Sequence, residues 1–194
     1  MQRYTGLHRA AAHGEVALIK PGNVDVRDGR GRTALHVAAF RAQRDAMRAL
    51  VAAGANPNAL ENDRYDIVTI AAVANDAPTL KLALELGASA KNVTSRYDGT
   101  ALIAAAHLGN VEAVRILTAA GAPLDHVNNL GWTALMESIV LGDGGPRHAE
   151  ALKVLLDAGA DPNIADRAGV TPLAQARARG YWAMAKLLEA RRAR

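Results

Sequence analysis

A segment of similar sequence recurs six times along the 194-residue chain, and this recurrence constrains the fold more than any other feature. Each copy begins with threonine or aspartate ahead of a short apolar run, and successive copies start 28, 33, 34, 33 and 38 residues apart. The starting residues are Thr5, Thr33, Asp66, Thr100, Thr133 and Thr171. A unit of this length cannot bury its own apolar face, so the copies are expected to stack into a solenoid.

Each copy also carries the local signals of two short helices and a loop. Threonine and aspartate are favoured N-caps, because a side-chain oxygen accepts a hydrogen bond from a free N–H of the first turn. Pro172 follows the last starting residue, in the first helical position, where its missing N–H costs nothing. Glycine follows the second apolar stretch in four units, where a left-handed residue closes a helix. These glycines are Gly54, Gly87, Gly121 and Gly159.

Two short motifs identify the type of repeat. The segments Thr33–His36, which reads TALH, and Thr171–Ala174, which reads TPLA, resemble the T-P-L-H signature of ankyrin repeats. The segments Gly54–Asn58 and Gly159–Asn163 are similar to the G-A-D-x-N that ends an ankyrin repeat. The period near 33 residues is also the ankyrin period, whereas tetratricopeptide repeats lack a loop of this kind.

The resemblance implies an all-α ankyrin-repeat solenoid of stacked helix-turn-helix units with hairpin-like loops. It covers essentially the whole chain, so we expect a single domain over residues 1–194. The expected units are approximately 3–30, 31–63, 64–97, 98–130, 131–168 and 169–194.

Three units depart from the pattern. Only 17 residues separate Thr5 from Gly22, so the second helix of the first unit is expected to be about one turn short. The third unit has Asp66 where the family has threonine, and aspartate still serves as a cap. The fifth unit has about five additional residues, Gly142–Pro146, which are interpreted as a flexible loop between its helices.

The composition argues against several classes of function. The chain has no cysteine, which excludes disulfides, thiolate metal sites and a cysteine nucleophile. It has no run of about 18 apolar residues, and no HExxH, Walker A or GxSxG motif. His8 and His36 occupy the T-x-L-H position, and the resemblance implies that this histidine is structural. We therefore expect no enzyme activity, no cofactor and no metal.

The resemblance implies that partners bind the concave surface formed by the loop tips, the residues before the caps and the ends of the first helices. The residues predicted to bind a partner are Arg30, Arg32, Phe40, Arg41, Asn62, Asp63, Tyr65, Arg96, Tyr97, His107, Asn129, Leu130 and Trp132. Seven aromatic residues occur in the chain, and five map onto this surface while the remaining two follow the last loop. They are Tyr4, Phe40, Tyr65, Tyr97, Trp132, Tyr181 and Trp182.

Tyrosine, tryptophan and arginine are the residues enriched in interface hot spots, so this surface is interpreted as a protein-binding strip. The competing interpretation is that the rings pack on neighbouring loops and only stiffen them. The predicted function is a non-catalytic protein–protein interaction module. The alternatives are a nucleic-acid-binding protein or a regulatory or inhibitory subunit of an enzyme.

Charge and length lead to further expectations about partners. The net charge of +4 is positive near both ends and negative in residues 51–150, which is not the continuous basic stripe of a nucleic-acid binder. Arginines near the N-terminus favour a partner with an acidic patch. We expect a monomer that does not enter a membrane, located in the cytoplasm, or in the periplasm if a leader peptide has been removed.

Overall fold

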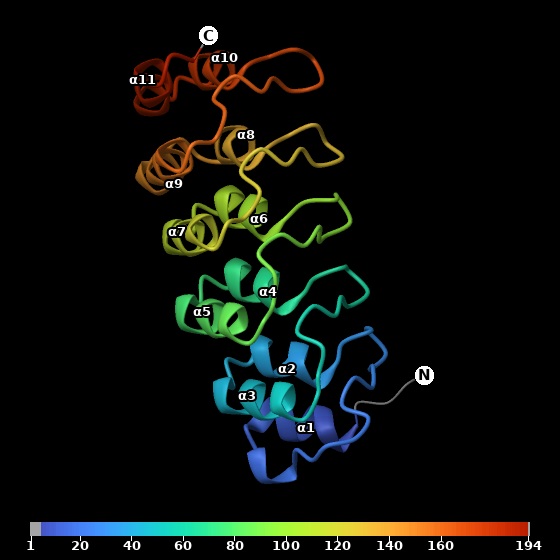
Figure 1. Ribbon diagram of the computed structural model, residues 1–194. Coiled ribbons are helices and arrows are strands. Elements are labelled where there is room, and N and C mark those ends of the chain that lie inside the picture. Colours follow the sequence, from blue (N-terminus) through green and yellow to red (C-terminus); the bar gives the residue numbers. More distant parts are fainter. Residues whose placement is uncertain (1–4, 194) are drawn as a thin grey trace.

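The computed structural model describes residues 5–193, which form eleven α-helices and one short 3₁₀ helix stacked in layers (Figure 1). The expected all-α solenoid is confirmed. Five inner helices lie next to the loops: α2 (Ala34–Phe40), α4 (Ile67–Val73), α6 (Ala101–His107), α8 (Ala134–Val140) and α10 (Pro172–Ala178). Five outer helices pair with them: α3 (Arg44–Ala52), α5 (Ala77–Glu85), α7 (Val111–Ala119), α9 (Pro146–Asp157) and α11 (Trp182–Ala190).

The six predicted N-caps all precede a helix and have extended backbone. In the third unit, the backbone N–H of Thr69 donates to the Asp66 carboxylate at 2.8 Å, so aspartate replaces threonine as a cap. In the second unit, the Thr33 side chain and the His36 ring cap each other's backbone in a reciprocal arrangement. Satisfying these free N–H groups is what starts each short helix at a defined residue.

The four predicted glycines end the outer helices. Gly54, Gly87, Gly121 and Gly159 have positive φ angles of 101°, 93°, 75° and 99°. Each immediately follows the C-cap residue, the position at which a left-handed residue reverses the chain into the next loop.

The core consists of small aliphatic side chains. Leucine or valine lies two residues after each cap from the second unit onward: Leu35, Val68, Leu102, Leu135 and Leu173 are all buried. Fully buried alanines, such as Ala38, Ala72 and Ala106, belong to inner helices, which contact one another from layer to layer. A methyl group lets helices approach closely, and within residues 5–193 no aromatic ring belongs to this buried core.

The first unit is shorter than the sequence predicted. After α1 (Gly6–His13), the expected helix is only a three-residue 3₁₀ turn, η1 (Val16–Leu18). The prediction of a helix one turn short was therefore wrong, because the chain must reach Gly22 with too few residues to form a second α-helix. The end of the stack is left with an exposed Leu18, which is 62% accessible.

The additional residues of the fifth unit are bonded on several sides. The Tyr181 hydroxyl donates to the Gly142 carbonyl oxygen at 3.1 Å, and the Asp143 carboxylate accepts from the Gly145 N–H at 2.8 Å. A Cβ at Gly142 would collide with the carbonyl oxygen of Ser138. The insertion is thus a compact turn followed by a 12-residue α9, three residues longer than the other outer helices.

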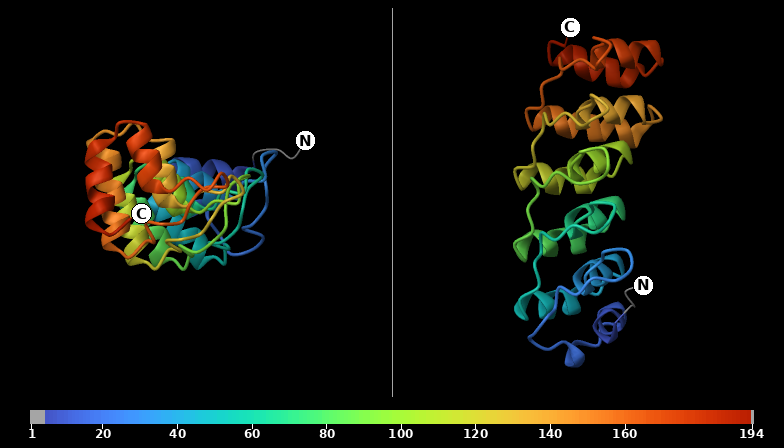
Figure 2. Two further views of the ribbon diagram at one scale, coloured as in Figure 1. Left: turned by 90° about the horizontal axis from the view of Figure 1, so that it is seen from above. Right: turned by 90° about the vertical axis from the view of Figure 1, so that its right-hand side faces the viewer.

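All the long loops leave the helical stack on the same side (Figure 2). They extend from the inner helices, so the loops and the inner helices together form an angled surface. Within residues 5–193, none of the helices has both the length and the apolar character needed to cross a membrane.

Candidate functional site

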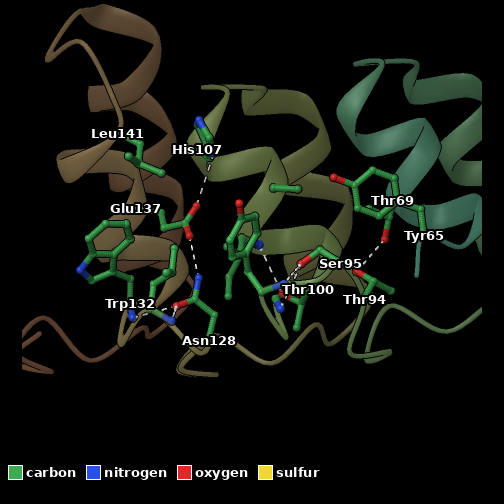
Figure 3. Close-up of a pocket in the computed structure, with 15 residues that line it drawn as sticks. Tyr65, Thr69, Thr94, Ser95, Thr100, His107, Asn128, Trp132, Glu137 and Leu141 are labelled. Carbon is green, nitrogen blue, oxygen red and sulfur yellow. Dashed lines mark hydrogen bonds and ion pairs between the residues drawn. The ribbon is translucent and has the colours of Figure 1, made fainter. Parts of the chain in front are cut away.

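Each loop is counted from here on with the inner helix that follows it. A cavity of about 430 Å³ lies where the loops of the third to fifth units meet α6 and α8 (Figure 3). Its lining includes three aromatic rings, several hydroxyl side chains and three larger polar side chains. The rings and the larger polar residues are Tyr65, Tyr97, Trp132, His107, Asn128 and Glu137. The loops supply the rings and Asn128, whereas the inner helices supply His107 and Glu137. The cavity therefore depends on residues from three consecutive units.

A recurring polar side chain shapes each loop from inside. Five residues before each cap from the second unit onward, a side-chain oxygen accepts hydrogen bonds from the backbone N–H groups two and four residues later. The residues are Asp28, Glu61, Ser95, Asn128 and Asp166. Two of these hydrogen bonds fix the backbone of aromatic residues. The Trp132 N–H donates to the side-chain oxygen of Asn128 at 3.0 Å, and the Tyr65 N–H donates to the carboxylate of Glu61 at 3.0 Å. These five residues carried no prediction, although a polar residue at a fixed distance before each cap is visible in the sequence.

Neighbouring loops are also bonded to each other at their tips. The backbone N–H of Asn62 donates to the Arg30 carbonyl at 3.1 Å, and that of Asn129 donates to the Tyr97 carbonyl at 2.9 Å. Arg96 forms an ion pair with Asp63, which joins the third and fourth loops. The rings thus sit on a connected row of loops, which holds their spacing.

The aromatic rings lie at the surface and outside the packed interior. Tyr65 and Trp132 are half-buried, Tyr97 is 58% exposed and Phe40 is 69% exposed. Burial raises the pKa of the Tyr65 hydroxyl, and the nearby carboxylates of Asp63 and Glu61 raise it further. Tyr65 therefore stays protonated and neutral at physiological pH. Tyr4 lies outside the described residues.

The arginines in the loop before α2 and at the end of α2 differ in how free their guanidinium groups are. The guanidinium of Arg32 donates to the Asp28 carboxylate at 2.7 and 2.8 Å, and Arg27 donates to the carbonyl oxygens of Gly31 and Leu60. Burial alone would raise the pKa of Asp28, but the bonds from Arg32 and the loop backbone outweigh it and the pKa is lowered. Arg27 and Arg32 therefore serve to hold the loops together.

Arg30 and Arg41, by contrast, are exposed. Within the part of the chain that the structure describes, their side chains form no hydrogen bond or ion pair.

Glu137 is the residue that sequence reasoning missed. It lies on α8, four residues after the cap, where the preceding units have Val37, Ile70 and Ala104. Its side chain is only 6% exposed and points between the loop and α6 (Figure 3). A polar residue at a position that is apolar in three neighbouring units was the signal available in the sequence.

The carboxylate of Glu137 has two different neighbours. The Asn128 amide donates to its Oε1 at 2.7 Å, while its Oε2 lies 3.5 Å from the Nδ1 of His107. Burial raises the pKa of Glu137 to about 7, against the opposing effect of the Asn128 hydrogen bond. Burial also lowers the pKa of His107, and nearby His148 lowers it further. Near neutral pH the cavity therefore holds a partly ionised carboxylate beside a mostly neutral imidazole.

The remaining buried histidines link units. His8 donates from Nε2 to the Arg32 carbonyl at 2.8 Å and His36 to the Tyr65 carbonyl at 3.2 Å, while each Nδ1 contacts its own cap threonine. The structural role expected for both is confirmed. His148 links the insertion to α6 through the His107 carbonyl at 2.8 Å. Among residues 5–193, no three acidic or histidine side chains are grouped so as to hold a metal ion.

The structure distributes the predicted partner-binding residues over adjoining hollows. The main cavity includes Tyr65, Tyr97, His107, Leu130 and Trp132. A second hollow, between the second and third loops, includes Arg30, Arg32, Phe40, Arg41, Asp63 and Tyr65. Arg96 joins a small hollow beside Tyr97, whereas Asn62 and Asn129 lie at exposed loop tips and line none of these hollows.

Comparison with known proteins gives concordant results. The family model described as "Ankyrin repeats (3 copies)" matches residues 2–66 and 68–166. The crystal structure of an ankyrin repeat domain from Acinetobacter baumannii is 44% identical, with a TM-score of 0.90, covering 97% of this chain and 98% of that one. The ankyrin repeat protein YahD of Escherichia coli is 33% identical over 185 residues, 92% of each chain. The crystal structure of the ankyrin repeat protein EF0377 is 27% identical, with a TM-score of 0.87, over 97% of this chain and 98% of that one.

Proposed function

Because the chain belongs to the ankyrin repeat family, we propose that it binds a partner protein through the concave surface of its loops and inner helices. Ankyrin repeats are generally protein–protein interaction modules and are generally non-catalytic. In this proposal the whole chain acts as one monomeric, non-catalytic binding domain of six units.

The observation that carries the proposal is the row of accessible rings along the loops. Tyr65, Tyr97 and Trp132 line one cavity, and Phe40 continues the row over the next hollow. A stack that keeps bulky rings out of its core and holds them at its surface has the composition of a binding hot spot. A contact of standard size would cover about 800 Å² of this surface.

The charges of the surface divide it into two parts. Exposed Arg30 and Arg41 would face an acidic patch of the partner near the second loop. Carboxylates occupy the region next to it, with Glu61 and Asp63 in the loop and Glu137 in the cavity. This alternation supports a protein partner over nucleic acid, which needs positive charge along a continuous path. Regulation or inhibition of an enzyme and a cytoplasmic location stay predictions.

The test is affinity capture from cells of the source organism. The wild-type chain is compared with a triple variant, Y65A/Y97A/W132A, and with Trp182→Ala, which removes a ring that is 64% exposed on the remote helix α11. We expect the triple variant to lose the captured partner, by roughly tenfold or more in affinity, and the control to retain it. Full capture by a triple variant with an unchanged melting curve would refute the proposed surface.

A further inference from the structure

We propose that the cavity over α6 and α8 receives a lysine or arginine side chain of the partner, with Glu137 as its counter-ion and the surrounding rings as its walls. This inference rests on the proposed function, since it identifies what part of a partner the concave surface recognises. Four features of the cavity support the inference. They are a buried carboxylate, aromatic walls, the absence of a lysine or arginine among the described lining residues, and a hydrogen bond from Asn128 to Glu137 that an uncharged acceptor could also receive.

The carboxylate is placed by the fold and still has an acceptor available. Glu137 is 6% exposed, yet it lines the cavity. Asn128 occupies Oε1, and the orientation of Asn128 is set because its own oxygen accepts from Leu130 and Trp132. No described residue donates a hydrogen bond to Oε2, whose nearest basic neighbour is His107 at 3.5 Å.

The walls suit a cation. Tyr65, Tyr97 and Trp132 line the same cavity, and a cation near the face of such rings is attracted by their quadrupoles. Among residues 5–193, no lysine or arginine lines the cavity and His107 is its only basic lining residue, with a pKa that burial lowers. A positive group that enters would therefore meet one anion and several ring faces, with no competing fixed cation.

The local structure does not require a carboxylate at position 137. In the sixth unit, the corresponding loop-to-helix bond runs from the Gln175 amide on α10 to the Asp166 carboxylate in the loop, at 2.7 Å. An amide on the helix thus makes the same connection. Placing the charge on the helix in the fifth unit buries it, which is costly unless another charge compensates it.

The cavity volume of about 430 Å³ admits one long side chain.

The first experiment measures binding of small cations to the chain itself. The probes are n-butylguanidinium and n-butylammonium, with n-butanol as the neutral control. In a Trp182→Phe background, Trp132 is the only tryptophan, so its indole N–H resonance reports on the cavity. We expect both cations, and not the alcohol, to shift this resonance saturably, and 0.5 M salt to suppress the shift.

The decisive variant is Glu137→Gln, which keeps an oxygen to accept from Asn128 and has a natural precedent in Gln175. We expect it to weaken cation binding at least tenfold. Glu85→Gln makes the same change in net charge on the outer helix α5, where Glu85 is exposed, and is expected to change nothing. Equal cation binding by wild type and Glu137→Gln, or no cation binding by the wild type, would overturn the inference.

The second experiment measures binding of the captured partner protein to the variants. If the triple aromatic variant loses the partner and Glu137→Gln binds it as tightly as wild type, the proposed function stands and the cation inference fails. If the triple variant retains the partner, the proposed surface itself is wrong. Support requires that Glu137→Gln weakens the partner at least tenfold and that exchanging one partner lysine or arginine for glutamine has no additional effect in that variant.

Discussion

The fifth and sixth units connect their loop to their inner helix with the same kind of hydrogen bond, but they place the charge at opposite ends. In the fifth unit, the Asn128 amide in the loop donates to the Glu137 carboxylate on α8 at 2.7 Å. In the sixth, the Gln175 amide on α10 donates to the Asp166 carboxylate in the loop at 2.7 Å. The bond is equivalent, so what differs is the surroundings of the charge.

Those surroundings shift the pKa values of the two carboxylates in opposite directions. Hydrogen bonds from the backbone N–H of Val170 and from Gln175 lower the pKa of Asp166 against a smaller effect of burial. Burial raises the pKa of Glu137 to about 7. The comparison shows that an amide and a carboxylate can form this bond in either order, so the bond itself does not fix where the charge lies.

The largest expected effect on the free energy of unfolding comes from removing the loop side chain of the hydrogen bond, Asn128 in the fifth unit and Asp166 in the sixth. Asn128→Ala should destabilise the protein by about 3 kcal/mol, because it frees two partly buried loop N–H groups and leaves Glu137 buried without its donor. Asp166→Ala removes the same number of hydrogen bonds in a more exposed loop and should cost clearly less. Urea unfolding at pH 7 measures both values, and equal costs would show that burial does not distinguish the two units.

The next effect is the pH dependence of stability caused by Glu137. Because its folded pKa is raised from 4.5 to about 7, the folded state binds more protons than the unfolded state between these values. The free energy of unfolding of the wild type therefore falls, relative to Glu137→Gln, as pH rises through this window, and the difference levels off above pH 7. We expect Glu137→Gln to match the wild type near pH 4.5 and to be more stable by about 2 kcal/mol at pH 8.

The measurement is urea unfolding of both proteins at several pH values. The control is Glu85→Gln, for which the difference from wild type should not change with pH, since Glu85 is exposed. A stability difference between wild type and Glu137→Gln that is flat from pH 4.5 to 8 would contradict a buried carboxylate.

The smallest effect is expected from transplanting the arrangement of the fifth unit into the sixth. The double variant D166N/Q175E exchanges the amide and the carboxylate while keeping one bond between them. Position 175 is more exposed than position 137 and lies at the end of the stack, so the free energy of unfolding should change less than in Asn128→Ala. Thermal melting of the double variant beside each single variant gives the answer, and a loss above about 2 kcal/mol would show that the two units are not interchangeable scaffolds.

Much of the fold followed from short-range signals. The cap at Asp66 was predicted because a side-chain oxygen needs only the next three residues to make its bond. Gly87 was predicted to end its helix for the similar reason that its left-handed backbone is a local property. The 3₁₀ turn of the first unit was not predicted, because its length depends on where the chain must arrive at the next layer.

Only part of the candidate site could be predicted from the sequence. The rings of Tyr65, Tyr97 and Trp132 were assigned to the surface because the resemblance maps their positions onto the loops, and the structure places them there. Glu137 was passed over as an ordinary acidic residue. Its nearest partners, Asn128 and His107, lie 9 and 30 residues before it in the chain, so neither its burial nor its raised pKa has a local signature.

The sequence by itself determined the repeat, the N-caps of the inner helices and the glycines that end the outer helices, because these depend on period and capping within one unit. Only the tertiary structure decided that three loops and three inner helices would enclose a cavity with a carboxylate in it. It also decided that Tyr181 would bond the Gly142 turn 39 residues before it. The physical reason is that burial and electrostatic environment are properties of the stack, which no single unit possesses.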